Sequence, residues 1–277
     1  MSIKRKIISK IMMTSTLLCA LVTLIPLISI FLYVISKGIT NINLDFFMNL
    51  PKPVGEPGGG MSNAIVGSLI LVGLSSIWAI PVSILGGVYL AEYGNNKLGT
   101  IIRFLADVLS GIPSIVVGIF AYVVFVLPMK TFSTISGAFA LGIIMIPSVM
   151  RITEEMVRMV PNTLREASWA LGISQFRTTV SIVLKTAKAG IITGVMLSIA
   201  RIAGETAPLL FTAFGNRFWN QGLNTPIASL PLQIFVYAMS PFEDWHKQAW
   251  SGALVLIMLV FLTSYLSRRT MKSRYKI

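Results

Sequence analysis

Residues 161–174 read PNTLREASWALGIS and lie in a polar island, residues 151–188, that separates two apolar runs. Thr163 and Glu166 have the Ser/Thr-x-x-Glu spacing of a capping box, in which each residue satisfies a free backbone N–H at the start of a helix. This spacing predicts a short helix over residues 164–171. The island therefore contains folded structure outside the apolar runs.

The end of this short helix is predicted at Gly172, which can take the left-handed conformation that terminates a helix. Ser174 can then cap a second helix. The first helix carries the small residues Ala167, Ser168 and Ala170, which would let the surface of another protein approach its backbone. The sequence thus predicts a helix–turn–helix elbow suited to docking; a well-capped loop with no partner is the alternative.

The composition excludes a soluble globular domain. Of the 277 residues, 55% are hydrophobic and only 12% are charged, which predicts an all-α integral membrane protein. The single cysteine, Cys19, excludes an internal disulfide and a cysteine-based metal cluster. Since His246 is the only histidine, we expect no metal site and no catalytic residues.

Six apolar runs are long enough to cross a hydrocarbon core of ~30 Å at ~1.5 Å per helical residue. We expect residues 1–60 to form a cytoplasmic amino terminus, a first span and an outer loop. Residues 61–270 would form a five-helix core that includes the elbow, and residues 271–277 a basic cytoplasmic tail. The six runs cover approximately residues 11–36, 63–90, 104–127, 132–150, 189–211 and 249–266.

Basic residues indicate which side of the membrane each loop faces. They are concentrated before the first run, in the polar island and after the last run, whereas the alternate loops hold only Lys37, Lys52, Lys130, Arg217 and Lys247. The positive-inside rule then places both termini and the elbow in the cytoplasm. This distribution accounts for most of the net charge of +13 without a nucleic-acid partner.

Arg201 lies in the middle of the fifth predicted span, and Glu205 follows four residues later. A charged side chain at that depth is costly unless it faces a polar cavity or a partner, and this spacing puts both groups on one helix face. A guanidinium matches a tetrahedral oxyanion, and a carboxylate can accept a hydrogen bond from a protonated oxygen, which phosphate has at neutral pH and sulfate lacks. Alternatively, the two charges only neutralise each other and hold helices together.

Asp107 lies four residues after Arg103. On a helix this spacing favours a local salt bridge between the two side chains, so we expect a structural role for Asp107.

Two motifs resemble those of a known family. Glu166-Ala167-Ser168, followed by Gly172 and by Ile182-Val183-Leu184, resembles the EAA loop of ABC importer permeases, although Lys185 stands where that pattern usually has proline. Residues 200–213, ARIAGETAPLLFTA, resemble the fifth-span signature of the PstA family, the permease subunits of phosphate importers. Shorter similar stretches are Ala91-Glu92-Tyr93, Gly111-Ile112-Pro113-Ser114-Ile115-Val116, Ser229-Leu230-Pro231-Leu232-Gln233-Ile234 and Ala249-Trp250.

The resemblance implies a type I ABC importer permease (MetI-like) fold with six transmembrane helices. It implies that Arg201 and Glu205, with the neighbouring Thr206, belong to the translocation path. The elbow would dock on a separate ATPase subunit through Thr163, Glu166, Ala167, Ser168 and Gly172. The implied partners are a second, related permease chain, two copies of the ATPase and an extracytoplasmic phosphate-binding protein, in a bacterial or archaeal cell membrane.

The predicted function is therefore that of a permease subunit that forms half of an alternating-access path for inorganic phosphate. The chain has no G-x-x-x-x-G-K-[ST] loop, so ATP would be hydrolysed by the partner, and we expect neither enzymatic activity nor a bound cofactor in this chain. The nearest alternative is an importer of another oxyanion, such as sulfate or molybdate. A further alternative is an ion-coupled secondary transporter, which needs no ATPase-docking elbow.

Overall fold

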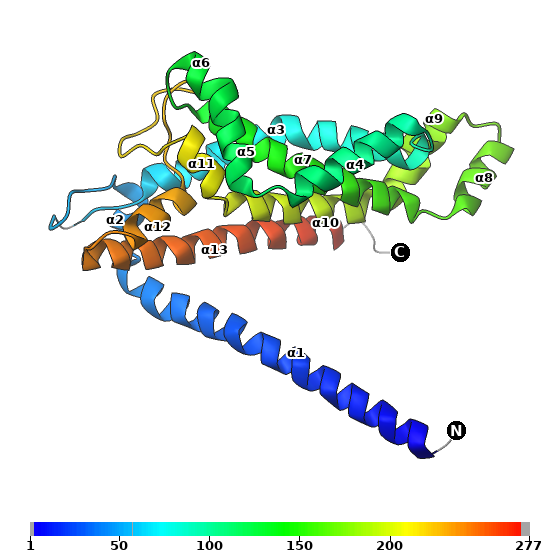
Figure 1. Cartoon of the computed structure of the whole chain (residues 1–277), viewed down its shortest axis with the longest axis horizontal. Coiled ribbons are helices and arrows are strands. Elements are labelled where there is room, and N and C mark those ends of the chain that lie inside the picture. Colours follow the sequence, from blue (N-terminus) through cyan, green and yellow to red (C-terminus); the bar gives the residue numbers. More distant parts are fainter. Residues whose placement is uncertain (1–2, 57, 273–277) are drawn as a thin grey trace.

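The computed structural model describes residues 3–56 and 58–272, and its regular elements are helices (Figure 1). A body of long helices lies side by side: α7 packs against α3 and α10, and α13 packs against α10. The first turns of α1 and the last turns of α13 lie toward the same end of the molecule as α8 and α9 (Figure 1). The elements are α1 (Ile3–Gly38), η1 (Ile39–Asn41), α2 (Leu44–Met48), α3 (Ser62–Glu92), α4 (Lys97–Gly111), α5 (Ser114–Ala121), η2 (Tyr122–Val126), α6 (Leu127–Met129), α7 (Thr134–Arg158), α8 (Asn162–Ala170), α9 (Gln175–Thr178), η3 (Thr179–Val183), α10 (Leu184–Ala203), α11 (Ala207–Thr212), α12 (Leu230–Ala238) and α13 (Glu243–Lys272).

The structure confirms the predicted number of spans when one bent pair is counted as a single span. Five helices are long and apolar enough to cross a membrane, and the pair Lys97–Gly111 and Ser114–Met129 qualifies together but is bent by 103°. The third predicted span, residues 104–127, is therefore broken, and it begins earlier than predicted, at the start of α4. Pro113 explains the break: it disfavours helical backbone at the preceding residue, and Ile112 is extended with ψ of 131°.

The fifth span also differs from its prediction. Its helix covers Gln175–Ala203 and ends at Gly204, and the short α11 follows after the break. The predicted run over residues 189–211 is therefore divided between α10 and α11, and Arg201, predicted in the middle of the span, lies in the last turn of α10. Pro208, in the first turn of α11, lacks the N–H that a continuous helix would need there.

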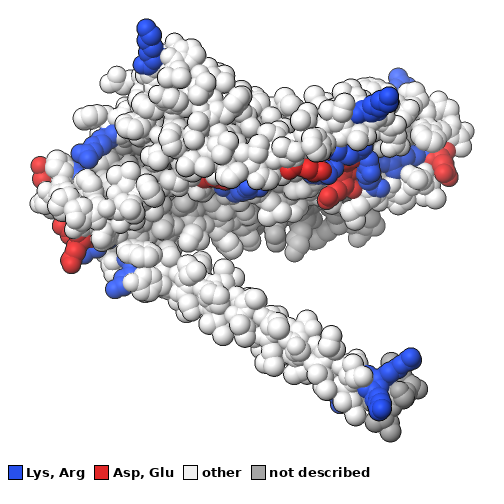
Figure 2. All heavy atoms as spheres, in the orientation of Figure 1, with Lys and Arg blue, Asp and Glu red and all other residues white. Residues whose placement is uncertain are grey.

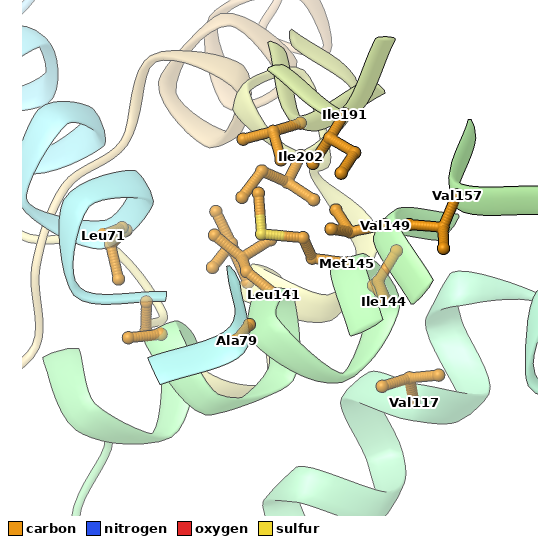
Figure 3. Close-up of a cluster of buried hydrophobic side chains, with 14 of the residues drawn as sticks. Leu71, Ala79, Val117, Leu141, Ile144, Met145, Val149, Val157, Ile191 and Ile202 are labelled. Carbon is orange, nitrogen blue, oxygen red and sulfur yellow. The ribbon is translucent and has the colours of Figure 1, made fainter. Parts of the chain in front are cut away.

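The centre of the body is a cluster of buried apolar side chains at the α3–α7–α10 interface, including Leu141, Met145 and Ile202 (Figure 3). Lipid tails are as apolar as these side chains, so close packing, rather than escape from water, holds membrane helices together. Gly142 shows how close this packing is, because a Cβ there would lie 2.1 Å from a ring carbon of Trp78. The helices α7 and α10, which carry the candidate site residues, are therefore closely packed in this structure.

Helix α1 stands away from this body (Figure 1). Only 6% of the apolar part of α1 is buried. Its contacts with α13 are near its carboxyl-terminal end, where the Tyr33 and Trp250 rings pack edge to face with their centroids 5.1 Å apart. The Ser251 hydroxyl donates a 2.7 Å hydrogen bond to the carbonyl of Gly38. Figure 2 shows an uncharged surface along α1 with basic side chains at its free end. The predicted basic tail lies mostly outside the described residues.

Candidate functional site

The elbow forms at its predicted place. Helices α8 and α9 are joined by a turn in which Gly172 has φ of +75°. The N–H of Gly172 donates to the carbonyl of Trp169 at 2.9 Å, and that of Ile173 donates to Ser168 at 3.2 Å. These bonds satisfy carbonyls at the end of α8, and the left-handed Gly172 confirms the predicted helix end.

The predicted capping box is wrong. Helix α8 begins at Asn162 with Pro161 in the cap position, so Thr163 lies inside the first turn and no side chain caps the helix. Proline fixes φ near the helical value and needs no N–H partner, which explains why the helix starts earlier than the Thr163 spacing indicated. Ser174 does occupy the cap position of α9, but its side chain makes no capping hydrogen bond.

The exposed face of the elbow differs from the one predicted. Ser168 is buried, and its hydroxyl lies 2.7 Å from that of Thr178, so it joins α8 to α9. Thr163, Glu166 and Ala167 are exposed as expected. Large apolar side chains that the sequence analysis did not single out are exposed around the turn: Leu164, Trp169, Leu171 and Phe176.

Gly172→Ala is expected to destabilise the elbow by about 1–2 kcal/mol, because a side chain in the left-handed conformation meets the following carbonyl. Space is not the cause, since no atom lies within 4 Å of a Cβ at this position. Gly222→Ala is the matched control: its surroundings are equally open and its φ is not positive. Proteolysis rates of the elbow measure the effect, and equal rates in the two variants would contradict it.

Arg201 and Glu205 face each other across the end of α10. The Arg201 Nε lies 4.0 Å from a Glu205 oxygen, and the Arg201 side chain is 54% exposed while that of Glu205 is 18% exposed. Among the described residues, Arg201 makes one other polar contact: its Nη1 atom lies 3.5 Å from the hydroxyl of Ser148 in α7. Since a guanidinium has five N–H donors and these contacts are long, most of its donors remain available to an anion.

Thr206 is next to this pair in the sequence and takes the cap position of α11, where its side chain makes no capping hydrogen bond. A cation in the last turn of α10 is thus followed, in the break before α11, by a carboxylate and a hydroxyl on adjacent residues. The structure brings Arg201 and Glu205 together, and it adds Ser148, which sequence spacing did not indicate.

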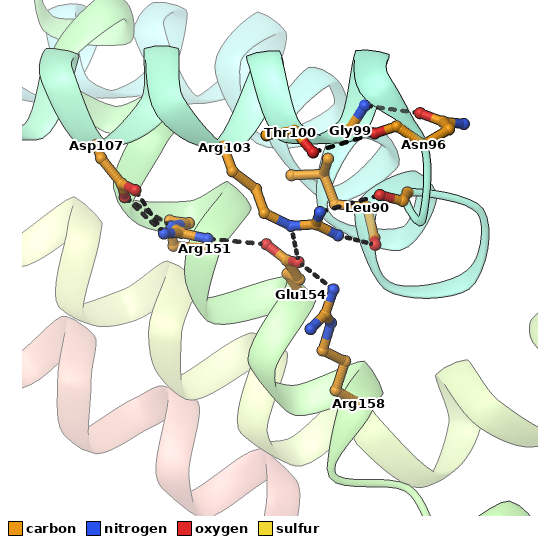
Figure 4. A network of polar contacts seen from close by, with 10 residues as sticks. Leu90, Asn96, Gly99, Thr100, Arg103, Asp107, Arg151, Glu154 and Arg158 are labelled. Carbon is orange, nitrogen blue, oxygen red and sulfur yellow. Dashed lines mark hydrogen bonds and ion pairs between the residues drawn. The ribbon is translucent and has the colours of Figure 1, made fainter.

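A second group of charges joins α4 to α7 (Figure 4). The buried Glu154 carboxylate forms ion pairs with three arginines, with N–O distances of 2.6 Å to Arg103, 2.9 Å to Arg158 and 3.2 Å to Arg151. Arg151 also donates to both carboxylate oxygens of Asp107, at 2.6 and 2.8 Å. The predicted Arg103–Asp107 salt bridge is therefore wrong, because Arg103 instead reaches Glu154 and the carbonyls of Leu90 and Gly94 at the end of α3.

Comparisons with known proteins agree with this architecture. The alginate ABC transporter of a bacterium, solved with an alginate-bound periplasmic protein, contains a chain that superposes with a TM-score of 0.71 at 12% identity over 99% of this chain and 98% of its own. A chain of the inward-facing MetNI methionine ABC transporter superposes with a TM-score of 0.60 at 16% identity, over 76% of this chain and 92% of its own length. These similarities confirm the predicted type I ABC importer permease fold.

Similar sequences narrow the family. Residues 83–273 match the family described as the binding-protein-dependent transport system inner membrane component. The phosphate transport system permease protein PstA of Pasteurella multocida is 45% identical over 95% of this chain and 94% of its own length. PstA of Xylella fastidiosa is also 45% identical, over 99% and 96%, and a probable PstA of Methanocaldococcus jannaschii is 35% identical, over 90% and 88%. The chain belongs to the PstA family of phosphate transport system permease proteins.

Proposed function

We propose that this chain is the permease subunit of an ATP-driven importer of inorganic phosphate and forms half of its alternating-access path. The observation that carries the proposal is the similarity to PstA proteins along almost the whole chain. Arg201 gives the proposal a chemical basis, because it is a mostly unpaired guanidinium at a break in a membrane span. A charged group in such a place has a functional role more often than a structural one.

The chemistry of the Arg201 site favours phosphate over sulfate. The guanidinium donates to the oxyanion, and the Glu205 carboxylate accepts a hydrogen bond from the oxygen that phosphate keeps protonated at neutral pH. Sulfate has no such proton, so its oxygens would meet the carboxylate as like charges. Glu205 also reduces the net positive charge of the site, which lets the anion leave.

The proposed complex has four further subunits in a bacterial or archaeal cell membrane. A second, related permease chain covers the exposed Arg201 and completes the path. Two ATPase copies lie at the cytoplasmic face, on the side of both termini, and hydrolyse the ATP; one of them binds the elbow of this chain, which itself binds no cofactor. An extracytoplasmic binding protein delivers phosphate. Closure of the ATPases displaces α8 and α9 and reorients the spans, so that Arg201 faces each side of the membrane in turn.

Competition in the assembled complex tests the substrate assignment. Radiolabelled phosphate uptake into vesicles is measured with a hundredfold excess of unlabelled phosphate, sulfate or molybdate. We expect only unlabelled phosphate to compete. Equal competition by sulfate would assign the complex to the other oxyanion, in spite of the family similarity.

Docking of the ATPase is expected to depend on Leu171, which projects from the turn of the elbow and is 80% exposed. Burying a leucine in an interface contributes about 1.5–3 kcal/mol, so Leu171→Ser should weaken ATPase capture by roughly 10- to 100-fold. Leu44→Ser is the matched control, because Leu44 is 79% exposed in α2, far from the elbow in the chain. Co-purification of the ATPase measures the effect; equal capture by both variants would exclude Leu171 from the interface.

A further inference from the structure

Helix α8 is attached to the spans through very few side chains. Its two buried residues are Arg165 and Ser168, and Ser168 contacts α9 within the elbow itself. Arg165 is the one that reaches the spans. Residues 159–161 also join α8 directly to α7, and α8 lies against η3, so a displacement of α8 reaches the spans through these links, through α9 and through the contacts of Arg165.

Arg165 contacts the ends of two long helices. Its Nη2 atom lies 2.8 Å from a carboxylate oxygen of Glu92, the last residue of α3, and donates a 3.0 Å hydrogen bond to the carbonyl of Val157 in α7. Its Nη1 atom donates a hydrogen bond to the carbonyl of Val160, just beyond the end of α7. One guanidinium thus donates to two carbonyls at the end of α7 and is paired with the carboxylate at the end of α3.

Glu92 extends this connection to the fifth span. Its second oxygen lies 3.5 Å from the hydroxyl of Thr179, where η3 begins and leads into α10. Helix α7 carries Ser148, and α10 carries Arg201. The Arg165–Glu92 pair therefore joins the elbow to the helices that hold the candidate anion site.

Stability alone does not explain this pair. Both side chains are almost fully buried, with 10% and 6% exposed, and a buried ion pair is often no more stable than apolar side chains of the same size. It does provide short, directional, charge-assisted bonds. Such bonds hold a fixed distance between two elements under load better than apolar contacts, which can slide.

We propose that Arg165 and Glu92 form the positioning contact that transmits movement of the docked elbow to α3, α7 and α10. The inference rests on the proposed function, since it assumes an ATPase bound to the elbow. Loss of the contact would leave the ATPase bound and active but would disconnect hydrolysis from transport.

The test measures phosphate transported per ATP hydrolysed, with bound ATPase quantified, in vesicles holding the complete complex. Glu92→Gln keeps the shape of the side chain and leaves the carbonyl contacts of Arg165 in place. We expect ATP hydrolysis within about twofold of wild type and a coupling ratio at least fivefold lower. Arg165→Gln should lower the ratio similarly, and the double variant should be no worse than either single variant, because the residues act through one contact.

Arg103→Gln is the matched control. It removes another buried ion pair and the carbonyl bonds at the end of α3, yet Arg103 touches neither α8 nor α9 in the described contacts. We expect a less stable complex with a wild-type coupling ratio. If Glu92→Gln fails to assemble, the apolar pair Glu92→Leu/Arg165→Met avoids an unpaired buried charge and should also lower the ratio.

The outcomes separate the inference from the proposed function. A wild-type ratio in Glu92→Gln, or in the apolar double variant, would overturn the inference, and so would an equal fall in Glu92→Gln and Arg103→Gln. No ATP-driven phosphate uptake by the wild-type complex would overturn the proposed function itself, and the inference with it.

Discussion

Arg201→Gln is expected to abolish phosphate uptake by the complex while leaving the chain folded and the ATPase bound. The guanidinium is half-exposed and lies 4.0 Å from Glu205, so little of the fold depends on it. Its hydrogen bonds to a charged ligand contribute about 1.5–3 kcal/mol each. Losing two of them reduces uptake at limiting phosphate by roughly 100-fold or more.

Two further variants make this result specific. Arg217→Gln removes an exposed arginine that lies over the Trp245 ring in the segment between α11 and α12, and it should leave uptake nearly unchanged. Glu205→Gln should retain uptake but reduce the preference for phosphate over sulfate, because the amide can donate to a fully deprotonated oxyanion. Normal uptake by Arg201→Gln would show that Arg201 is only a structural partner of Glu205.

Glu154→Ala is expected to destabilise the chain by about 1.5–3 kcal/mol, the usual contribution of a hydrogen bond to a charged group. Glu154 is the shared acceptor of Arg103, Arg151 and Arg158, and its side chain is only 4% exposed (Figure 4). In this variant Arg151 still pairs with Asp107, and Arg103 still donates to two carbonyls. The contact that is lost is mainly the one between Arg103 in α4 and Glu154 in α7. The bent third span would then detach from the body at a lower temperature.

The neighbouring Glu155 supplies the control, because it is exposed on the same helix. Glu155→Ala should change stability by less than about 0.5 kcal/mol. Thermal unfolding in detergent, together with the yield of assembled complex, measures both variants. Similar midpoints for the two would mean that the arginines around Glu154 find other acceptors and that the network contributes little.

The sequence predicted what depends on composition and local spacing. Long apolar runs identified the spans because a membrane helix needs about 20 apolar residues whatever its neighbours are. Gly172 marked the end of α8 because few other residues tolerate its backbone conformation. The Arg201–Glu205 spacing favoured phosphate over sulfate, and the family resemblance supplied the prediction of an importer.

What the sequence did not predict depends on tertiary contacts. Pro113 breaks a span, while Pro81 and Pro147 lie inside continuous helices, and the sequence alone does not separate these cases. Asp107 pairs across helices with Arg151 instead of along its own helix. The spacing of Arg151, Glu154 and Arg158 could have indicated the charge network, whereas no local signal relates Arg165 to Glu92, which are 73 residues apart.

The most direct measurement of the central claim is the energy source of phosphate accumulation by the reconstituted complex. Vesicles containing this chain, its partner permease, the ATPase and the binding protein are loaded with ATP at the ATPase face, and radiolabelled phosphate uptake is followed with and without a protonophore. We predict accumulation that requires ATP, is unaffected by the protonophore and disappears when this chain is omitted. Uptake that continues without ATP and collapses with the protonophore would contradict the account and identify an ion-coupled transporter.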